Sequence, residues 1–531
     1  MTSAPRISHD QGSSPSASRT KSLAAAVSAR PLAVALLIVA AIIAVRAQGT
    51  VDADVAWELW IGHQLNRGAH LYRDIVETNP PLWFWLARPV DWLSQLSHLR
   101  SDHVLIALMG LAAALSLFAT DRMIGPVDPP RRTSFLAYAA LILVAMPWVQ
   151  IGQREHIALI ATLPYAALIA ARRAGRPAPL ILAFSIGGGA ALGFALKHYF
   201  LIVPLLLEVW LLAAQRKSWR PVRPETAAMA AVGLAYAAAM LIFAHDYFTL
   251  VVPMLLLAYG ATGAKHFVDL FQPAVVTALV CIVLLLAGRP WRRSEAPELV
   301  SALIVAAVGF TIIYFIQAKG WSYHAVPMLG CAAMALAGAV ALDPDPRRLT
   351  ILAAPALLCL PFTIAAQQAQ RDAESGRDVA DAVTGMRAGD TVGFLSADPS
   401  FGWHVVLQRG YRFPLRYNGF WMMQAIVSNG LRGGGDPRLT QLGRRIVGET
   451  VADFECTPPR RIIVARPNPG QARSGEFDLL AFFLRDPRFA RLMAHYRPVE
   501  RGKLEAFEFE SPLERARICP RWSPAWEKPQ F

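Results

Sequence analysis

The feature that most constrains this chain is a series of apolar runs separated by short loops. Of its 531 residues, 54% are hydrophobic and only 17% are charged, whereas a soluble globular chain carries about 25% charged residues. The runs are long enough to cross a bilayer core of about 30 Å. We therefore predict a polytopic α-helical membrane protein. Its eleven predicted spans are 31–45, 103–124, 134–151, 156–171, 178–196, 199–214, 225–243, 267–288, 298–316, 325–342 and 349–366.

The distribution of basic residues gives an expected orientation. The formal net charge is +14, and most of the Arg and Lys residues cluster in short loops between apolar runs, as the positive-inside rule requires. This placement excludes nucleic-acid binding as the reason for the charge. One orientation, with the N-terminus cytosolic, puts every short basic loop inside. These loops contain Arg131/Arg132, Arg172/Arg173/Arg176, Arg216/Lys217/Arg220/Arg223, Arg289/Arg292/Arg293 and Arg347/Arg348.

The spans divide the chain into three predicted parts. Residues 1–30 are too polar to bury a core and are expected to form a disordered cytosolic tail. Residues 31–366 form the transmembrane domain, whose first run is expected to be an uncleaved anchor because Arg46 fits poorly beside a signal-peptide cleavage site. Residues 367–531 then lie outside, in the periplasm of a bacterium with an inner membrane. On the cytosolic side, we expect Glu208 and Glu225 to pair with the Arg-rich loop.

The segment after residue 366 has the pattern of a small α/β domain. Strand-like runs at 391–396, 461–465 and 504–509 are separated by helix-like stretches at 478–483 and 488–495. An oxidising compartment would permit a Cys456–Cys519 disulfide, although two free thiols fit the sequence equally well.

The first outer loop, residues 47–102, contains two predicted amphipathic helices on either side of Pro80-Pro81. Trp57, Trp60, Ile61 and Leu65 have helical spacing, and a second apolar face follows from residue 82 to residue 96. We expect both helices to lie at the membrane interface. They would hold Asp52 and Asp54 at the bilayer surface.

Ionisable residues gather in the other outer loops, where they run against the positive-inside rule. Ionisable groups at membrane depth are costly and usually mark a site or a pathway. The loops contain Arg154, Glu155 and His156; Lys197 and His198; Lys265 and His266; and Lys319, Tyr323 and His324.

A carboxylate pair that faces several cations suggests transfer from a membrane-bound phosphate donor. A carboxylate can accept the proton of an acceptor hydroxyl, while cations stabilise the charge on the departing phosphate. No GxxxxGK[ST] nucleotide signature is present. An outer-face enzyme without a nucleotide site fits a lipid-linked donor.

The first outer loop also resembles that of a known family. Its GxxLxxGxxLYxD spacing runs from Gly62 to Asp74, and residues 77–82 read ETNPPL. This pattern is similar to the GT-C membrane glycosyltransferases, in the branch of the protein O-mannosyltransferases and the lipid A aminoarabinose transferase. The resemblance implies an inverting transfer of one sugar from a polyprenyl-phosphate donor. The acceptor would be an envelope glycan, a lipid or a protein.

The resemblance also implies roles for individual residues. Asp54 matches the acid of the first loop, with Asp52 as the reserve catalytic candidate. The resemblance implies that Lys197, Lys319, Tyr323 and His324 lie near the donor phosphate. Arg154 matches no known role in the family and is expected near the phosphate because it is a cation in an outer loop. The further site candidates are Glu155, His156, His198, Glu77, Asn79 and Lys265.

No cofactor is firmly expected and no metal ligands are assigned, although an Asp-x-Asp pair leaves a divalent cation, Mg or Mn, as an alternative. Two other functions also stay open. A transporter or lipid flippase would use the same charges to line a pathway. A non-catalytic envelope-polysaccharide assembly protein would keep the fold without the reaction.

Overall fold

The computed structural model describes residues 30–49, 51–261, 267–345, 376–431, 435–465 and 478–510, with Cys359, Phe362, Thr363 and Ala366. The predicted cytosolic tail and nearly all of the predicted eleventh span therefore lie outside the described residues. Cys456 takes part in a disulfide, and Cys519 is also outside the described part of the chain.

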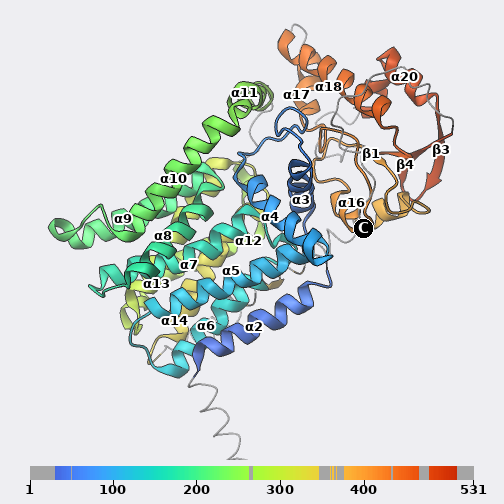
Figure 1. The fold of residues 1–531 in the computed structure, drawn as a ribbon. Helices are drawn as coiled ribbons and strands as arrows, with labels where there is room; N and C mark the ends of the chain where they lie inside the picture. The colour runs from blue at the N-terminus through green and yellow to red at the C-terminus, as the bar shows by residue number, and fades with distance from the viewer. Residues whose placement is uncertain are drawn as a thin grey trace, which may run out of the picture.

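A bundle of helices makes up most of the molecule, and a small α/β domain lies at one end of it (Figure 1). Several bundle helices begin with proline at their first or second position, where the missing N–H costs nothing. The helices of this part are α2 (Pro31–Arg46), α3 (Ala53–Asn66), α4 (Leu82–Ser97), α5 (Ser101–Met123), α6 (Pro129–Val144), α7 (Arg154–Arg173), α8 (Leu180–Ala195), α9 (Ile202–Gln215), α10 (Pro224–Phe243), α11 (Val252–Ala261), α12 (Pro273–Gly288), α13 (Pro297–Gln317) and α14 (Val326–Ala341).

The prediction of a polytopic membrane protein is confirmed. Among the described residues, five helical segments are long and apolar enough to cross a membrane: Ser101–Met123, His198–Ser218, Pro224–Phe243, Pro297–Gln317 and Ser322–Ala341. In Ser322–Ala341, 89% of the residues in the apolar stretch are buried inside the protein, so this helix lies in the centre of the bundle. In Pro224–Phe243, only 6% are buried. A helix that is apolar on all sides and exposed on nearly all of them is suited to contact with lipid.

Helix α11 was not predicted. It follows α10 after a wide helical turn at Tyr247–Val251 and has ten residues. At about 1.5 Å per residue such a helix covers only half of a bilayer core, so its apolar run is too short to be recognised as a span.

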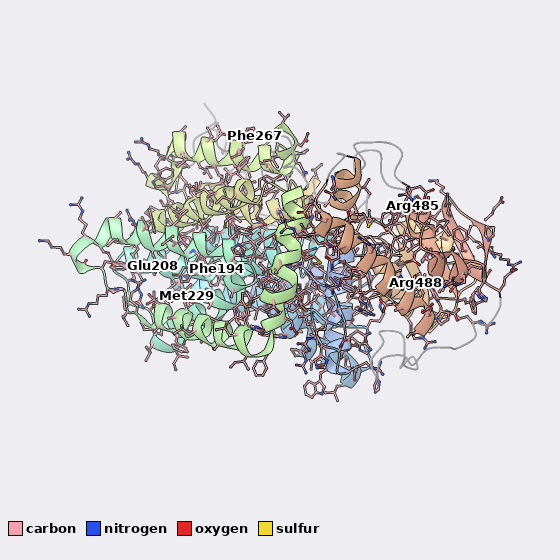
Figure 2. All side chains as sticks on the ribbon, turned by 90° about the horizontal axis from the view of Figure 1, so that it is seen from above. Phe194, Glu208, Met229, Phe267, Arg485 and Arg488 are labelled. Carbon is pink, nitrogen blue, oxygen red and sulfur yellow. The ribbon has the colours of Figure 1, made fainter. Side chains whose placement is uncertain are left out.

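The expected pairing of Glu208 and Glu225 with basic residues is confirmed. Arg172 Nη2 lies 3.0 Å from Glu225 Oε2, and Arg223 pairs with both glutamates. Glu208 lies in the helical bundle, well away from Arg485 and Arg488 in the α/β domain (Figure 2).

A four-stranded sheet forms the centre of the C-terminal domain, in the order β1-β2-β4-β3. Its strands are β1 (Val392–Leu395), β2 (Arg461–Val464), β3 (Tyr496–Arg501) and β4 (Leu504–Phe509), and its helices are α16 (Trp403–Arg409), α17 (Met423–Leu431), α18 (Pro437–Cys456), α19 (Leu479–Leu484) and α20 (Pro487–Met493). β1 and β2 are parallel, and both are buried along their whole length. The predicted α/β domain is therefore confirmed, with β3 as an additional strand at the edge of the sheet.

Helix α3 joins the two parts of the molecule. Trp57 and Trp60 stack with ring centroids 4.8 Å apart, and Trp403 of α16 packs against both at 4.5 and 5.4 Å. The neighbouring loop adds a backbone hydrogen bond, from Val76 N to Arg416 O. The prediction that the α3 tryptophans face the membrane interface is wrong: they are 2% and 8% exposed because the C-terminal domain covers them.

Candidate functional site

Two aspartates, Asp52 and Asp54, lie at the start of α3. Asp52 caps the helix, since its carboxylate accepts a hydrogen bond from Asp54 N at 2.9 Å. Gln153 Nε2 donates to the same Asp52 oxygen at 3.0 Å. Asp54 is only partly buried, and its Oδ1 accepts a hydrogen bond from Ser400 Oγ at 2.9 Å. The C-terminal domain therefore contributes directly to the surroundings of Asp54.

The surroundings of Asp54 perturb its acidity. Burial raises the pKa of its carboxyl above the ordinary value, while Arg154 and the hydrogen bond from Ser400 act in the opposite direction. Negative charges on Asp398 and Glu77 raise the pKa further. A carboxylate whose pKa is displaced towards neutrality is a better proton acceptor at physiological pH.

One helical turn further on, Glu58 pairs with Arg154 at the start of α7. Glu58 Oε1 lies 3.0 Å from Arg154 Nη1, and both side chains are almost completely buried. Burial raises the pKa of Glu58 well above its usual value, although the positive charge of Arg154 opposes this. Arg154 therefore lies close enough to Asp54 for its charge to act on it, while its ion pair is formed with Glu58.

A second cation lies beside this pair. Lys197 Nζ donates to Glu155 Oε1 at 2.6 Å and lies 3.2 Å from His324 Nε2. The same ammonium group is 5.5 Å from the centre of the Tyr323 ring. These residues come from three distant segments: the start of α7, the end of α8 and the turn at Ser322–Ala325 before α14. The predicted grouping of Arg154, Lys197, Tyr323 and His324 is thus present in the structure.

Several buried polar atoms in this cluster lack a hydrogen-bond partner within the described residues. They are Gln153 Oε1, Arg154 Nε and Glu155 Oε2. Leaving such an atom unpaired costs about 1 to 3 kcal/mol. Native proteins seldom tolerate this except where a ligand, an ion or water completes the arrangement. Their concentration around Asp54 marks this region as the candidate functional site.

Glu77 and Asn79 stabilise the loop in front of α4. Glu77 Oε1 accepts hydrogen bonds from the backbone N–H of Thr78 and Asn79 and from Asn79 Nδ2, at 2.7 to 2.9 Å. Its other oxygen accepts from Trp57 Nε1 at 2.6 Å. Because both oxygens are engaged, Glu77 is suited to hold the loop against α3.

The glycines of the GxxLxxGxxLYxD motif have structural roles. A Cβ at Gly62 would lie 2.7 Å from Ala87 Cβ, so glycine allows α3 and α4 to pack closely. Gly68 has a φ of +95°, which favours glycine in the turn after α3. Asp74 closes that turn by accepting from His70 N at 2.7 Å. The motif therefore builds the support of the site.

The remaining candidates lie apart from the cluster. Both ring nitrogens of His156 contact backbone groups, Gly152 N at 3.0 Å and Leu143 O at 2.7 Å, which fixes this side chain in the bundle. His198 is exposed and packs on Tyr199. Lys319 Nζ lies 3.3 Å from the centre of the Tyr259 ring on α11. Lys265 lies outside the described residues.

The sequence analysis missed the contribution of Ser400, which is separated from Asp54 by 346 positions. No sequence signal connects the two. The proximity of Glu58 to Asp54 can be recognised from the sequence, because Glu58 follows Asp54 by one helical turn on α3.

The side chains around Asp54 offer few ligands for a divalent cation. Within the described segments, no three His, Cys, Asp or Glu side chains form a group that could hold a metal ion. Two carboxylates would leave most of an octahedral coordination sphere to water or substrate. A dependence on Mg or Mn stays an untested expectation.

Comparison with known proteins gives matches to solved structures. The structure of ArnT from Cupriavidus metallidurans bound to undecaprenyl phosphate matches 91% of this chain and 98% of that chain, at 12% identity and a TM-score of 0.50. The mycobacterial arabinofuranosyltransferase AftD matches 91% of this chain at 14% identity and a TM-score of 0.44, and the match spans only 40% of AftD. Neither a protein-family model nor a curated protein sequence matches. At this level of identity the likeness concerns the fold alone, and this chain shares the fold of the ArnT structure.

Proposed function

We propose that the protein is an inverting glycosyltransferase that moves one sugar from a polyprenyl-phosphate donor to an acceptor hydroxyl. The observation that carries this proposal is the position of Asp54, a partly exposed carboxylate with a raised pKa that lies close to the buried cation Arg154. The undecaprenyl phosphate bound to ArnT supports a donor of this kind.

In the proposed reaction, the acceptor oxygen attacks the anomeric carbon of the donor sugar. The bond between that carbon and the phosphate oxygen breaks, and its electron pair leaves with the phosphate. Asp54 takes the proton of the acceptor hydroxyl. Arg154 and Lys197 stabilise the negative charge of the phosphate as it departs, and Tyr323 and His324 complete the same wall of the site.

The acceptor is proposed to be an envelope glycan, a lipid or a protein at the outer face of a bacterial inner membrane. The basic loops of the sequence support this location, because the positive-inside rule favours an orientation with the α3 end of the bundle outside. A soluble nucleotide-sugar donor has no corresponding Gly-rich phosphate loop in the chain.

The first test is the substitution Asp54→Asn in the native host, compared with wild type and a deletion strain. Asparagine preserves the size of the side chain but cannot act as the base, so transfer should fall by about 10² to 10⁴-fold. Asp436→Asn is a matched control, because Asp436 caps α18 and asparagine caps helices equally well.

Mass spectrometry of envelope glycans and polyprenyl-phosphate sugars gives the readout. Loss of one sugar, with accumulation of its lipid-linked donor in both the deletion and the Asp54→Asn strain, would support the proposal and identify both substrates. Full transfer by Asp54→Asn would refute the role of the base. Unchanged glycans and donors in the deletion strain would favour the transporter or the non-catalytic assembly function.

A further inference from the structure

A cavity lies away from the Asp54 cluster, beside the end of α3 and along α4. Its volume is about 580 Å³, and two arginines, two tryptophans, a proline and two amides line it: Arg67, Arg88, Trp85, Trp92, Pro89, Asn66 and Gln95. None of these residues belongs to the proposed donor site. We propose that this cavity binds the phosphate-bearing headgroup of an anionic membrane lipid.

A buried carboxylate organises the polar side of this cavity. Asp91 accepts hydrogen bonds from Asn66 Nδ2 and Gln95 Nε2 at 2.8 Å, and its Oδ1 lies 2.8 Å from His63 Nδ1. These hydrogen bonds outweigh the effect of burial and lower the pKa of Asp91. Asp91 therefore stays ionised and fixes the amides at the cavity wall.

The same network positions both guanidinium groups. Arg88 Nε donates to Asn66 Oδ1 at 2.9 Å. Arg67 Nη1 lies 3.0 Å from His63 Nε2. Because arginine can only donate, His63 Nε2 accepts this bond and its Nδ1–H donates to Asp91. Two guanidinium groups therefore lie at the cavity wall, and guanidinium is well suited to bind the oxygens of a phosphodiester.

Exposed apolar side chains continue from this cavity towards α5. On the same side of α4, Trp92 and Leu96 are 62% and 66% exposed, and Leu99 beyond the helix is 54% exposed. Helix α5, which is long and apolar enough to cross a membrane, begins directly afterwards at Ser101. Exposed tryptophan and leucine beside arginine, just before a span, are typical of side chains that insert at the membrane surface.

A lipid headgroup explains this combination better than a soluble anion does. A soluble phosphate would bind to the arginines alone and would have no use for the exposed apolar side chains Trp92, Leu96 and Leu99 beside them. The lipid would anchor α4, and with it the α3–α4 pair that carries Asp54. The inference does not depend on the proposed sugar transfer.

The test uses the full-length protein in detergent and native mass spectrometry with added phosphatidylglycerol or phosphatidylcholine. Wild type should retain one phosphatidylglycerol at least tenfold more tightly than phosphatidylcholine. The double variant Arg67→Gln/Arg88→Gln should lose this preference. Arg485→Gln is the matched control, because Arg485 is an exposed arginine of the C-terminal domain.

A second variant distinguishes loss of lipid binding from loss of folding. Trp92→Ala alters an exposed side chain, so it should keep the thermal unfolding temperature of wild type and weaken phosphatidylglycerol binding several-fold. Equal binding of the two lipids, or an unchanged preference in the double variant, would overturn the proposal. Displacement of phosphatidylglycerol by millimolar inorganic phosphate would also overturn it, in favour of a soluble anion.

Discussion

The pair between Lys197 and Glu155 leads to a prediction about donor binding. Lys197 is proposed to hold the donor phosphate, yet in the free protein its ammonium group already contacts Glu155 at 2.6 Å. Glu155 therefore competes with the phosphate for the same cation. The substitution Glu155→Gln should strengthen the binding of undecaprenyl phosphate, while Lys197→Met should weaken it.

The size of the effect follows from the burial of the pair. The side chains of Lys197 and Glu155 are only 10% and 1% exposed, and removing one partner of a buried ion pair costs about 3 to 5 kcal/mol. Glu155→Gln should therefore lower the stability of the free protein. A bound phosphate restores a negative partner to Lys197 and recovers part of this cost. Recovery of about 1.4 kcal/mol would increase the affinity tenfold.

The assay is a titration of the purified variants with undecaprenyl phosphate, with thermal unfolding followed in parallel. Glu225→Gln is the matched control, because Glu225 pairs with Arg172 at the opposite end of the bundle. It should reduce stability without changing the affinity. If Glu155→Gln weakens binding as much as Lys197→Met does, Glu155 orients Lys197 for the phosphate, and the competition argument is refuted.

Three further substitutions test the site and its support. Ser400→Ala removes a hydrogen bond that lowers the pKa of Asp54; the pKa should therefore rise, and the acid limb of the transfer rate against pH should move to higher pH, by about one unit at most. An unchanged limb would show that Asp54 is not the titrating base. Trp403→Ala removes a fully buried indole and should destabilise the docked C-terminal domain by about 3 to 5 kcal/mol, which limited proteolysis of the domain would detect as faster cleavage. Glu77→Gln alters a carboxylate that accepts several hydrogen bonds in the loop. It should lower the thermal unfolding temperature and leave the affinity for the sugar-accepting substrate nearly unchanged. A lower affinity with an unchanged unfolding temperature would place Glu77 in the binding site.

The sequence predicts best those parts of the fold that depend on neighbouring residues. Strands β1, β2 and β4 lie where short β-prone runs predict them, and the apolar runs form helices. β3 was missed because Pro498 interrupts its pattern. The structure accommodates this proline at the edge of the sheet, where its missing N–H breaks no hydrogen bond inside the sheet.

Contacts between distant segments set the limit of prediction. The spacing of Trp57 and Trp60 correctly predicts an apolar helix face, but periodicity does not tell whether lipid or protein covers that face. The same holds for the cations. The loops that carry Arg154, Lys197 and His324 were identified, whereas the pairing of each cation with a particular glutamate depends on how the helices pack.

The division of the site between two domains affects how its chemistry can be controlled. Asp54 and the cations belong to the helical bundle, while Ser400 and the indole that covers α3 belong to the C-terminal domain. Burial is the largest cause that raises the pKa of Asp54, and the nearby charge of Asp398 raises it further, whereas the hydrogen bond from Ser400 lowers it. Undocking of the C-terminal domain would remove the Asp398 charge, the Ser400 hydrogen bond and part of the burial. The pKa of Asp54 should therefore fall towards its ordinary value, and Trp57 and Trp60 would become exposed. Docking and the strength of the proposed base are therefore linked. A change in the C-terminal domain that loosens this interface should reduce transfer even where every residue of the bundle is intact.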